Sequence, residues 1–245
     1  TLNGCIMQNN DNANYINNLT LQDGARVTGY KIRVGYHSVA LIKVGGTAPS
    51  SLEAGINMVK YGANPLTLDV ADVTGDNAAD LLISGEIRDY NDFYTNMPII
   101  KAGAGTVSLS GTNTHVGPVT INAGTLVLDA GGALNPSNAV TLAGGALAMG
   151  SHSNAVGTLT LTADSTLLLG AGHLAFAASQ DTVWTDGRTL TVVGELGTRS
   201  VRMGTDATGL TPAQLAAITY NGASVRLTSR GYLSPHSRGT LIQIR

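Results

Sequence analysis

A repeat with a period of about 20 residues runs through the middle of this chain. It is carried by three segments, 119–128 (VTINAGTLVL), 140–149 (VTLAGGALAM) and 159–168 (LTLTADSTLL). In each segment, apolar residues alternate with Thr or other small residues, and this period of two predicts strands that bury one face. Ile121, Leu142 and Leu161 hold equivalent positions. The sequence therefore predicts an all-β fold, a parallel β-helix (β-solenoid) in which each coil buries its apolar face on the next.

The composition agrees with a narrow core made of many thin layers. The chain has 245 residues, 43% of them hydrophobic, with one Trp, two Phe and eight Tyr against 31 Gly. Aliphatic side chains must therefore build most of the core, as in a solenoid. A net charge of −2 with 12% charged residues gives no broad electrostatic surface for nucleic acid or an anionic membrane. No apolar run approaches the roughly 18 residues of a transmembrane segment.

Alternation extends the strand prediction on both sides of the repeat. Further strands are expected at 19–21, 25–27, 30–34, 38–44, 66–70, 81–84 and 189–193. Segment 51–59 fits a short helix or another strand equally well. The chain then divides into an Asn-rich arm or ragged first coil at 1–18, β-helix coils at 19–205 and a C-terminal cap at 206–245.

The C-terminal segment has the signals of a short helix followed by a hairpin. Thr211 is the expected N-cap of a helix that runs to Ile218, and Pro212 suits its first position because the missing N–H costs nothing there. Asn221 and Gly222 predict a tight turn. Strands are expected at 224–228 and 240–244. We expect the helix to close one end of the solenoid.

The stretch 101–126 (KAGAGTVSLSGTNTHVGPVTINAGTL) resembles the autotransporter-associated β-strand repeat of secreted bacterial passenger proteins. The preceding ISGEI at 83–87 and the GLTPAQLAAI at 209–218 are similar to segments of the same family. Pro118 and His115 depart from the family pattern and affect the loop geometry. The resemblance implies a right-handed parallel β-helix. It also implies a bacterial protein of the cell exterior or surface, present as a mature fragment after removal of an export signal.

A weak calcium-loop pattern lies between two predicted strands. Asp72, Asp76 and Asp80 stand at the first, fifth and ninth positions of a loop. Calcium needs six to eight oxygen ligands, but Thr74 and Asn77 replace the expected carboxylate and glycine, and no Glu follows at position 12. The favoured interpretation is a turn in which Asp and Asn side chains bind the local backbone. No cofactor is expected.

The search for catalytic groups favours a protein that is not an enzyme. β-Helix enzymes that cleave polysaccharides carry carboxylates on adjacent coils, whereas Thr120, Thr141 and Thr160 form an outward stripe of threonine. The alternative is a polysaccharide-binding or polysaccharide-cleaving β-helix, with a glycan groove built by Asp181, Trp184, Asp186 and Arg188. In the favoured interpretation, Trp184 instead closes the core at the edge of a coil.

Histidine and cysteine give no sign of a metal site. The five histidines are scattered and are expected in exposed loops: His37, His115, His152, His173 and His236. The single Cys5 excludes an intramolecular disulfide. It is interpreted as a free thiol, with an intermolecular bridge or an acylated lipobox cysteine as alternatives.

The ends of a β-helix expose unpaired strand edges, which can template association. Because the N-terminal region lacks an amphipathic helix that could cap it, we expect head-to-tail addition of strands between copies, giving an oligomer or filament. The expected assembly residues are Cys5, Ile6, Met7, Tyr15, Ile16, Leu241, Ile242 and Ile244. The predicted function is an extracellular structural or adhesive subunit of a surface fibre. A glycan or a ligand on the host or cell surface is a further expected partner.

Overall fold

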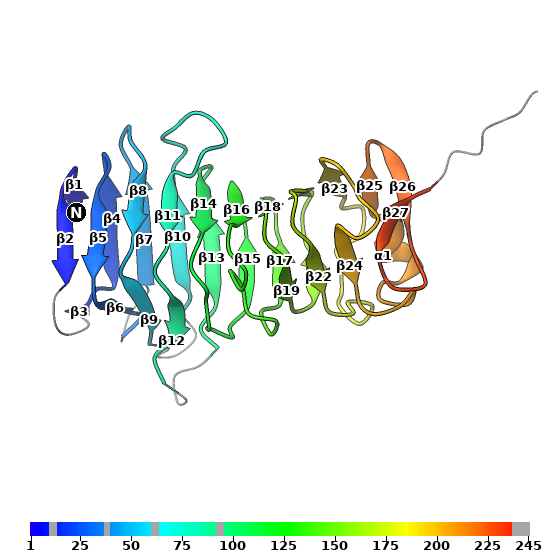
Figure 1. Cartoon of the computed structure of the whole chain (residues 1–245), viewed down its shortest axis with the longest axis horizontal. Helices are drawn as coiled ribbons and strands as arrows, with labels where there is room; N and C mark the ends of the chain where they lie inside the picture. The colour runs from blue at the N-terminus through cyan, green and yellow to red at the C-terminus, as the bar shows by residue number, and fades with distance from the viewer. Residues whose placement is uncertain (10–13, 37–39, 60–63, 92–95, 237–245) are drawn as a thin grey trace, which may run out of the picture.

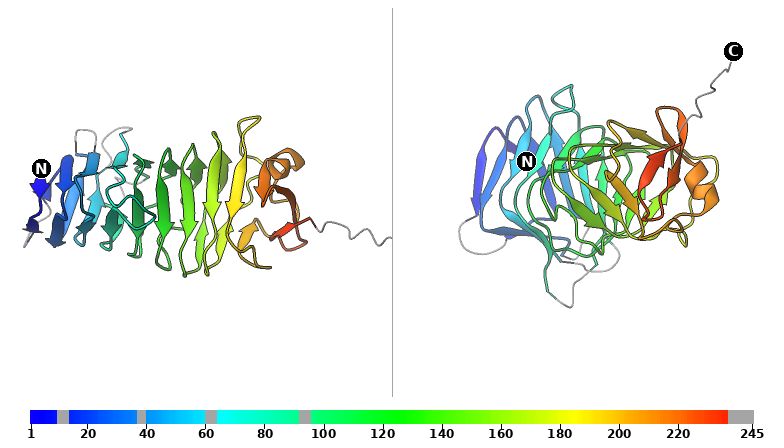
Figure 2. Two further views of the ribbon diagram at one scale, coloured as in Figure 1. Left: turned by 90° about the horizontal axis from the view of Figure 1, so that it is seen from above. Right: turned by 45° about the vertical axis from the view of Figure 1, so that its right-hand side comes forward.

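The structure is a computed structural model that describes residues 1–9, 14–36, 40–59, 64–91 and 96–236. The chain forms an elongated parallel β-solenoid of about eight turns, whose coils stack along one axis from the N-terminal to the C-terminal end (Figures 1 and 2). The described residues contain one short helix, α1 (Pro212–Ala216). The all-β class and the β-solenoid predicted from the repeat are confirmed.

Two long sheets run along the stack, and two short sheets complete it near either end. Long sheet 1 has the order β1 (Leu2–Asn3), β4 (Asn18–Gln22), β7 (Ala40–Gly45), β10 (Leu66–Val70), β13 (Ile99–Ala102), β15 (Val119–Ile121), β17 (Val140–Leu142) and β20 (Leu159–Leu161). Long sheet 2 has the order β2 (Ile6–Asn9), β5 (Arg26–Gly29), β8 (Ser50–Leu52), β11 (Leu81–Ile83), β14 (Thr106–Leu109), β16 (Thr125–Leu128), β18 (Ala146–Met149), β21 (Ser165–Leu168), β23 (Leu190–Val193), β25 (Ile218–Tyr220), β26 (Ala223–Leu227) and β27 (Leu233–Pro235).

The N-terminal short sheet has the order β12 (Ile87–Asp89), β9 (Gly55–Met58), β6 (Lys31–Val34) and β3 (Asn14–Tyr15). The C-terminal short sheet has the order β19 (Asn154–Val156), β22 (Leu174–Phe176) and β24 (Val201–Met203). Within these sheets the strands of successive coils pair in parallel, and the chain turns antiparallel only where β25, β26 and β27 meet. Residues 51–59, for which the sequence allows a helix or a strand, contribute to β8 and β9.

Inward residues stack in register from coil to coil. Ile121 pairs with Leu142, which pairs with Leu161, and all three are fully buried. Burying an aliphatic side chain of this size stabilises the fold by roughly 1.5–3 kcal/mol. Each coil is therefore held mainly by the apolar rows that it shares with its neighbours. The outward row beside it contains the predicted threonines Thr120, Thr141 and Thr160.

One repeat differs from the superposition of the three segments. Leu147 of β18 pairs with Leu167 rather than with Thr166, so the corner before β21 is one residue longer than the corner before β18. The extra residue has a structural role, because the Ser165 hydroxyl accepts a hydrogen bond from the Gly144 N–H (3.0 Å) and donates one to the Ala163 carbonyl (2.9 Å). The alignment by sequence is therefore wrong by one position along this strand.

His115 is the clearest correction to the sequence analysis. The expected exposed loop instead alternates exposed and buried residues: His115 has no exposed surface, and neither ring nitrogen has a hydrogen-bond partner, whereas Thr114 and Val116 are exposed. Burial lowers the pKa of His115 to about 4. The reason lies in the neighbouring coil, where the buried Asn138 amide binds the carbonyl oxygens of His115 (3.0 Å) and Gly117 (2.7 Å) and draws this segment inward. Exposed positions are confirmed for His152, His173 and His236, and His37 lies outside the described residues.

Lys101 is a buried cation that connects two adjacent coils. Its Nζ donates hydrogen bonds to the carbonyl oxygens of Ala102 (2.8 Å) and Gly103 (2.8 Å) in its own coil, and of Ala123 (3.0 Å) in the next. Burial lowers its pKa to about 8, although the charges of Asp69 and Asp80 oppose that shift. The apolar stem occupies the core, and the ammonium group satisfies the carbonyls at two stacked corners.

The C-terminal cap confirms the helix and hairpin signals. Thr211 is the N-cap of α1, Pro212 occupies the first turn, and Gln214 completes a capping box. The helix ends at Ala216, before Ile218 begins β25. Asn221 and Gly222 have positive φ angles of +50° and +72° in the turn between β25 and β26. The strand expected at 240–244 lies outside the described residues.

We expect Lys101→Met to reduce the free energy of unfolding by about 3 kcal/mol, because three partly buried carbonyl oxygens lose their donor. Urea titration followed by circular dichroism measures this loss. Lys43→Met is the matched control, because the Lys43 side chain is exposed on β7. Equal midpoints for the two variants would contradict the role assigned to Lys101.

The buried His115 predicts a specific acid sensitivity. Its pKa is lower in the folded than in the unfolded state, so the unfolded state binds the proton more tightly and stability falls as the pH drops from about 6.5 towards 4. At about 1.4 kcal/mol per pH unit, this contribution approaches roughly 3 kcal/mol at pH 4. Denaturation at several pH values should show a weaker dependence for His115→Met than for the wild type or His152→Gln. Identical pH profiles for all three proteins would refute this origin.

Candidate functional site

Trp184, the centre of the predicted glycan groove, closes the core at the end of long sheet 1. Its side chain is only 9% exposed and belongs to the apolar core. The indole Nε1 donates to the carbonyl oxygen of Leu159 (3.0 Å), on the last strand of that sheet, and lies 3.2 Å from the Thr182 hydroxyl. This arrangement agrees with the favoured interpretation, in which the residue seals a coil edge.

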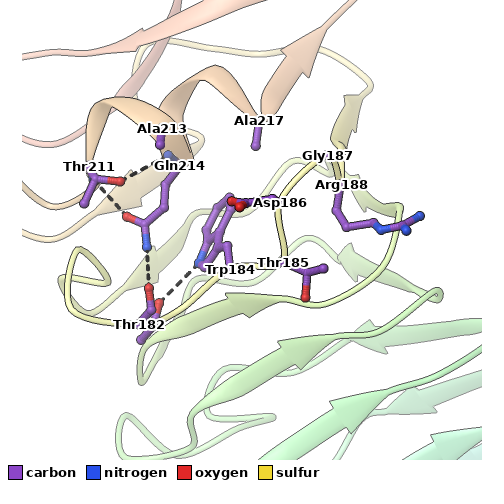
Figure 3. A pocket seen from close by; sticks show the side chains of 10 residues that line it. All are labelled: Thr182, Trp184, Thr185, Asp186, Gly187, Arg188, Thr211, Ala213, Gln214 and Ala217. Carbon is purple, nitrogen blue, oxygen red and sulfur yellow. Dashed lines mark hydrogen bonds between the residues drawn. The ribbon is translucent and has the colours of Figure 1, made fainter.

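A cavity of about 180 Å³ lies between the Trp184 segment and α1; we call it the cap cavity (Figure 3). Trp184, Asp186 and Arg188 line it together with Ala213, Gln214 and other residues, whereas Asp181 does not. The exposed Asp181 carboxylate instead accepts a hydrogen bond from the neighbouring Gln180 amide (3.2 Å). The structure thus brings three of the four predicted groove residues together.

The chemistry available in the cap cavity is limited. Asp186 is the only carboxylate among its lining residues, whereas glycoside hydrolysis generally uses two carboxylates about 5–10 Å apart. Arg188 extends away from Trp184 (Figure 3) and forms an exposed ion pair with Asp164 at 3.8 Å. The volume is also below the roughly 300 Å³ at which ligand pockets begin. These properties describe a seam between cap and coils better than a substrate site.

Gln214 fastens the cap to the solenoid. Its Nε2 donates to the carbonyl oxygens of Ser179 and Thr182, both at 2.8 Å, while its Oε1 accepts from the Thr211 N–H at 2.8 Å. Figure 3 shows the bonds to Thr182 and Thr211. This role of Gln214 was not predicted from the sequence. The available signal was the Thr211-x-x-Gln214 spacing of a capping box, which predicts the contact within the helix but not the contacts with the coil.

The calcium-loop pattern is used for backbone contacts. Asp80 is fully buried, and its Oδ1 accepts hydrogen bonds from the N–H groups of Val73 (2.8 Å) and Thr74 (2.9 Å) and from the Thr74 hydroxyl (3.0 Å). Its Oδ2 accepts from the Thr106 N–H at 2.7 Å. Burial would raise the pKa of Asp80, but these hydrogen bonds outweigh that effect and hold it below the usual value.

The other two carboxylates of the pattern form local turns. Asp72 accepts from the Gly75 N–H (2.7 Å), and Asp76 accepts from the Ala78 N–H (2.7 Å). These are the side chain to backbone contacts that the turn interpretation predicts. Within the described ranges, no three His, Cys, Asp or Glu side chains gather to form a metal site.

The first described coil of the solenoid is formed by β1, β2 and β3. Leu2 and Met7 face inward in register with Leu21 and Val27 of the next coil. The latter two are fully buried, whereas Leu2 and Met7 are only partly buried and pack on the core from one side. Each of the three strands is also the terminal strand of its sheet.

The remaining predicted assembly residues fall into separate groups. Ile6, 63% exposed, pairs with Arg26 on the outer face of long sheet 2, and Tyr15, 48% exposed, lies on the outer face of the N-terminal short sheet. Ile16 packs on the core and Cys5 is exposed. Leu241, Ile242 and Ile244 lie outside the described residues.

An aromatic cluster beside the N-terminal end was not predicted. The ring centroids of Tyr15 and Tyr36 are 4.6 Å apart, and the Arg33 guanidinium lies 5.3 Å from the Tyr15 ring and 4.6 Å from the Tyr90 ring. Arg33 and Tyr36 are neighbours in one coil, and the pairing register places Tyr15 of the preceding coil beside them. The excess of Tyr in the first hundred residues was the only available signal.

Comparison with known proteins identifies one segment of the chain. Residues 99–128 match the family model described as the passenger-associated-transport-repeat. No curated protein and no solved structure matches the chain. The match confirms the resemblance based on the repeat that begins with Lys101, and together with the β-solenoid it fits a passenger domain of an autotransporter. Such a repeat implies a secreted or surface protein.

The helix α1 is too short to span a membrane, and no other helix occurs in the described ranges.

We expect Gln214→Ala to loosen the cap, because the buried carbonyl oxygens of Ser179 and Thr182 lose their donor, at a cost of about 1–3 kcal/mol. Amide hydrogen exchange in residues 206–236 measures this change. Gln180→Ala removes a single exposed bond to Asp181 and serves as the control. Unchanged protection of the cap in Gln214→Ala would contradict the assigned role.

Proposed function

We propose that this chain is a structural or adhesive β-solenoid of the bacterial cell exterior, and that its N-terminal end associates with another copy. Its main support is the first described coil, where the inward Leu2 and Met7 are only partly buried. A further coil placed on β1, β2 and β3 would bury these side chains and pair three strand edges.

At the C-terminal end of long sheet 1, side chains satisfy the backbone groups of its last strand, β20. The Ser179 hydroxyl accepts a hydrogen bond from the Leu159 N–H (2.8 Å), and Thr182 and Trp184 donate to the Leu159 carbonyl oxygen. α1 and the β26–β27 hairpin continue this closure (Figure 2). This closure contrasts with the first described coil, where Leu2 and Met7 are only partly buried.

The association that we propose is head to tail, with residues 240–244 of one copy added as a strand to the N-terminal end of the next. A heterologous contact of this kind repeats without closing and builds a filament. Pairing of two N-terminal ends would instead stop at a dimer. Imaging by negative stain separates filaments from paired rods, and deletion of residues 237–245 should dissolve the filaments. Dimers that survive that deletion would contradict the head-to-tail arrangement.

The described surface supports a structural role over catalysis. The outward row of β15, β17 and β20 carries Thr120, Thr141 and Thr160, and the cap cavity contains one carboxylate. Binding of a glycan or of another surface ligand is compatible with this role, and an adhesive solenoid would present such a site on a face or a loop.

We expect Met7→Lys to prevent self-association, because it places a charge in the apolar section that a second copy would cover. Sedimentation velocity should show the wild type assembling with rising concentration and the variant remaining monomeric. Leu82→Lys is the control, because Leu82 lies on the outer face of long sheet 2, far from the end, and is 38% exposed. A wild type that stays monomeric, or a Leu82→Lys variant that dissociates equally, would refute association through the end.

A further inference from the structure

The outer face of the C-terminal short sheet combines small residues with a cation. Ala155 of β19 pairs with Ala175 of β22, which pairs with Arg202 of β24. The residues on either side of these three point inward and are buried. Arg202 therefore lies on the outer face beside two methyl groups, and Tyr232 forms a bridge with it from the opposite side. This sheet lies near the C-terminal end of the stack (Figure 1).

Two cavities adjoin on this face and share Ala175 and Arg202; together we call them the Arg202 groove. One has a volume of about 230 Å³ and is lined also by His173, Arg199 and Tyr232. The other has a volume of about 380 Å³ and is lined mainly by small and apolar residues. The larger cavity falls within the range of ligand pockets, and the pair forms one extended depression crossed by Arg202.

The charge of the Arg202 groove is positive and uncompensated. Neither cavity has an acidic lining residue, and none of the ion pairs among the described residues includes Arg199 or Arg202. The Nε atom of Arg202 is buried without a hydrogen-bond partner, which is costly unless an acceptor reaches it. A planar guanidinium is suited to two parallel hydrogen bonds with a carboxylate or a sulfate. The Arg202 side chain, which lines both cavities and forms none of the ion pairs among the described residues, is therefore suited to an oxyanion.

The position of the Arg202 groove favours a saccharide as the carrier of that oxyanion. Because the groove lies on the face of a sheet whose backbone groups are paired in the ladder, a peptide cannot add there as a strand. The ligand must be recognised by side chains. Alanine methyl groups and the Tyr232 ring suit the apolar face of a sugar ring, while Arg199 and Arg202 suit its acidic group. We propose that the Arg202 groove binds an acidic polysaccharide through carboxylate or sulfate groups.

Calorimetric titration of the full chain tests this site, with polygalacturonate as the carboxylated probe, dextran sulfate as the sulfated probe and neutral dextran for comparison. We expect one or both acidic polymers to bind, and neutral dextran not to bind. Arg202→Gln should weaken binding about ten- to hundredfold, as expected for loss of charged hydrogen bonds. Arg199→Gln, at an exposed position, should weaken it without affecting the fold. Rising salt should also weaken binding.

The double variant Arg226→Gln/Arg230→Gln is the matched control for Arg199→Gln/Arg202→Gln, because it removes the same charge from exposed positions on the C-terminal hairpin. It should bind like the wild type. The proposal fails if neither acidic polymer binds, if Arg199→Gln binds unchanged, if the control weakens binding equally, or if polyglutamate binds as tightly as the acidic polysaccharides. Met7→Lys, which should block self-association, should bind the acidic polymers like the wild type. Failure of the Arg202 proposal is thereby distinguished from failure of the proposed association.

Discussion

Each coil of this molecule can be stable only if both of its flat sides are covered. In a solenoid a coil contacts its two neighbours and little else, so its apolar rows and strand edges must be completed from above and from below. Interior coils meet this condition through register, as Ile121, Leu142 and Leu161 show. The terminal coils cannot meet it in that way. At the C-terminal end of long sheet 1, Trp184, Thr182 and Ser179 complete the polar groups of the last strand, whereas Leu2 and Met7 in the first described coil are only partly buried.

The corners impose a second condition, because the chain turns inside a packed stack and its polar backbone groups must still be satisfied. Asp80 accepts from N–H groups at the corners of two adjacent coils, and Lys101 donates to carbonyl oxygens at two. The glycines of KAGAGT have related roles: Gly103 has a φ of +73°, and a Cβ at Gly105 would lie 2.3 Å from the Ala71 carbonyl oxygen. The motif that matches the passenger repeat is thus a way of building a corner, which explains why it identifies the fold without indicating an activity.

The sequence predicts well those features that depend on local pattern. Alternation and period are sufficient for the coils, and the Thr211 and Pro212 signals are sufficient for the cap helix, because these depend on residues close together in the chain. Prediction from the sequence fails where the burial or register of a residue is determined by another coil. His115 has the sequence context of a loop and is buried because Asn138 binds its carbonyl from the next coil. The extra residue at Ser165 shifts a strand by one position, and no pattern within that segment reveals the shift.

The contrast between local sequence pattern and contacts from other coils also applies to the residues that can recognise a partner. Arg202 follows the alternation of β24 like any outward residue, and nothing in its own segment distinguishes it. Its environment arises because Ala155 and Ala175, in the two preceding coils, are small enough to leave space beside it. In a solenoid, a row of outward positions can change from one coil to the next without disturbing the core. Recognition sites can therefore arise by substitution of single outward residues, whereas an inward substitution disturbs the rows of both neighbouring coils.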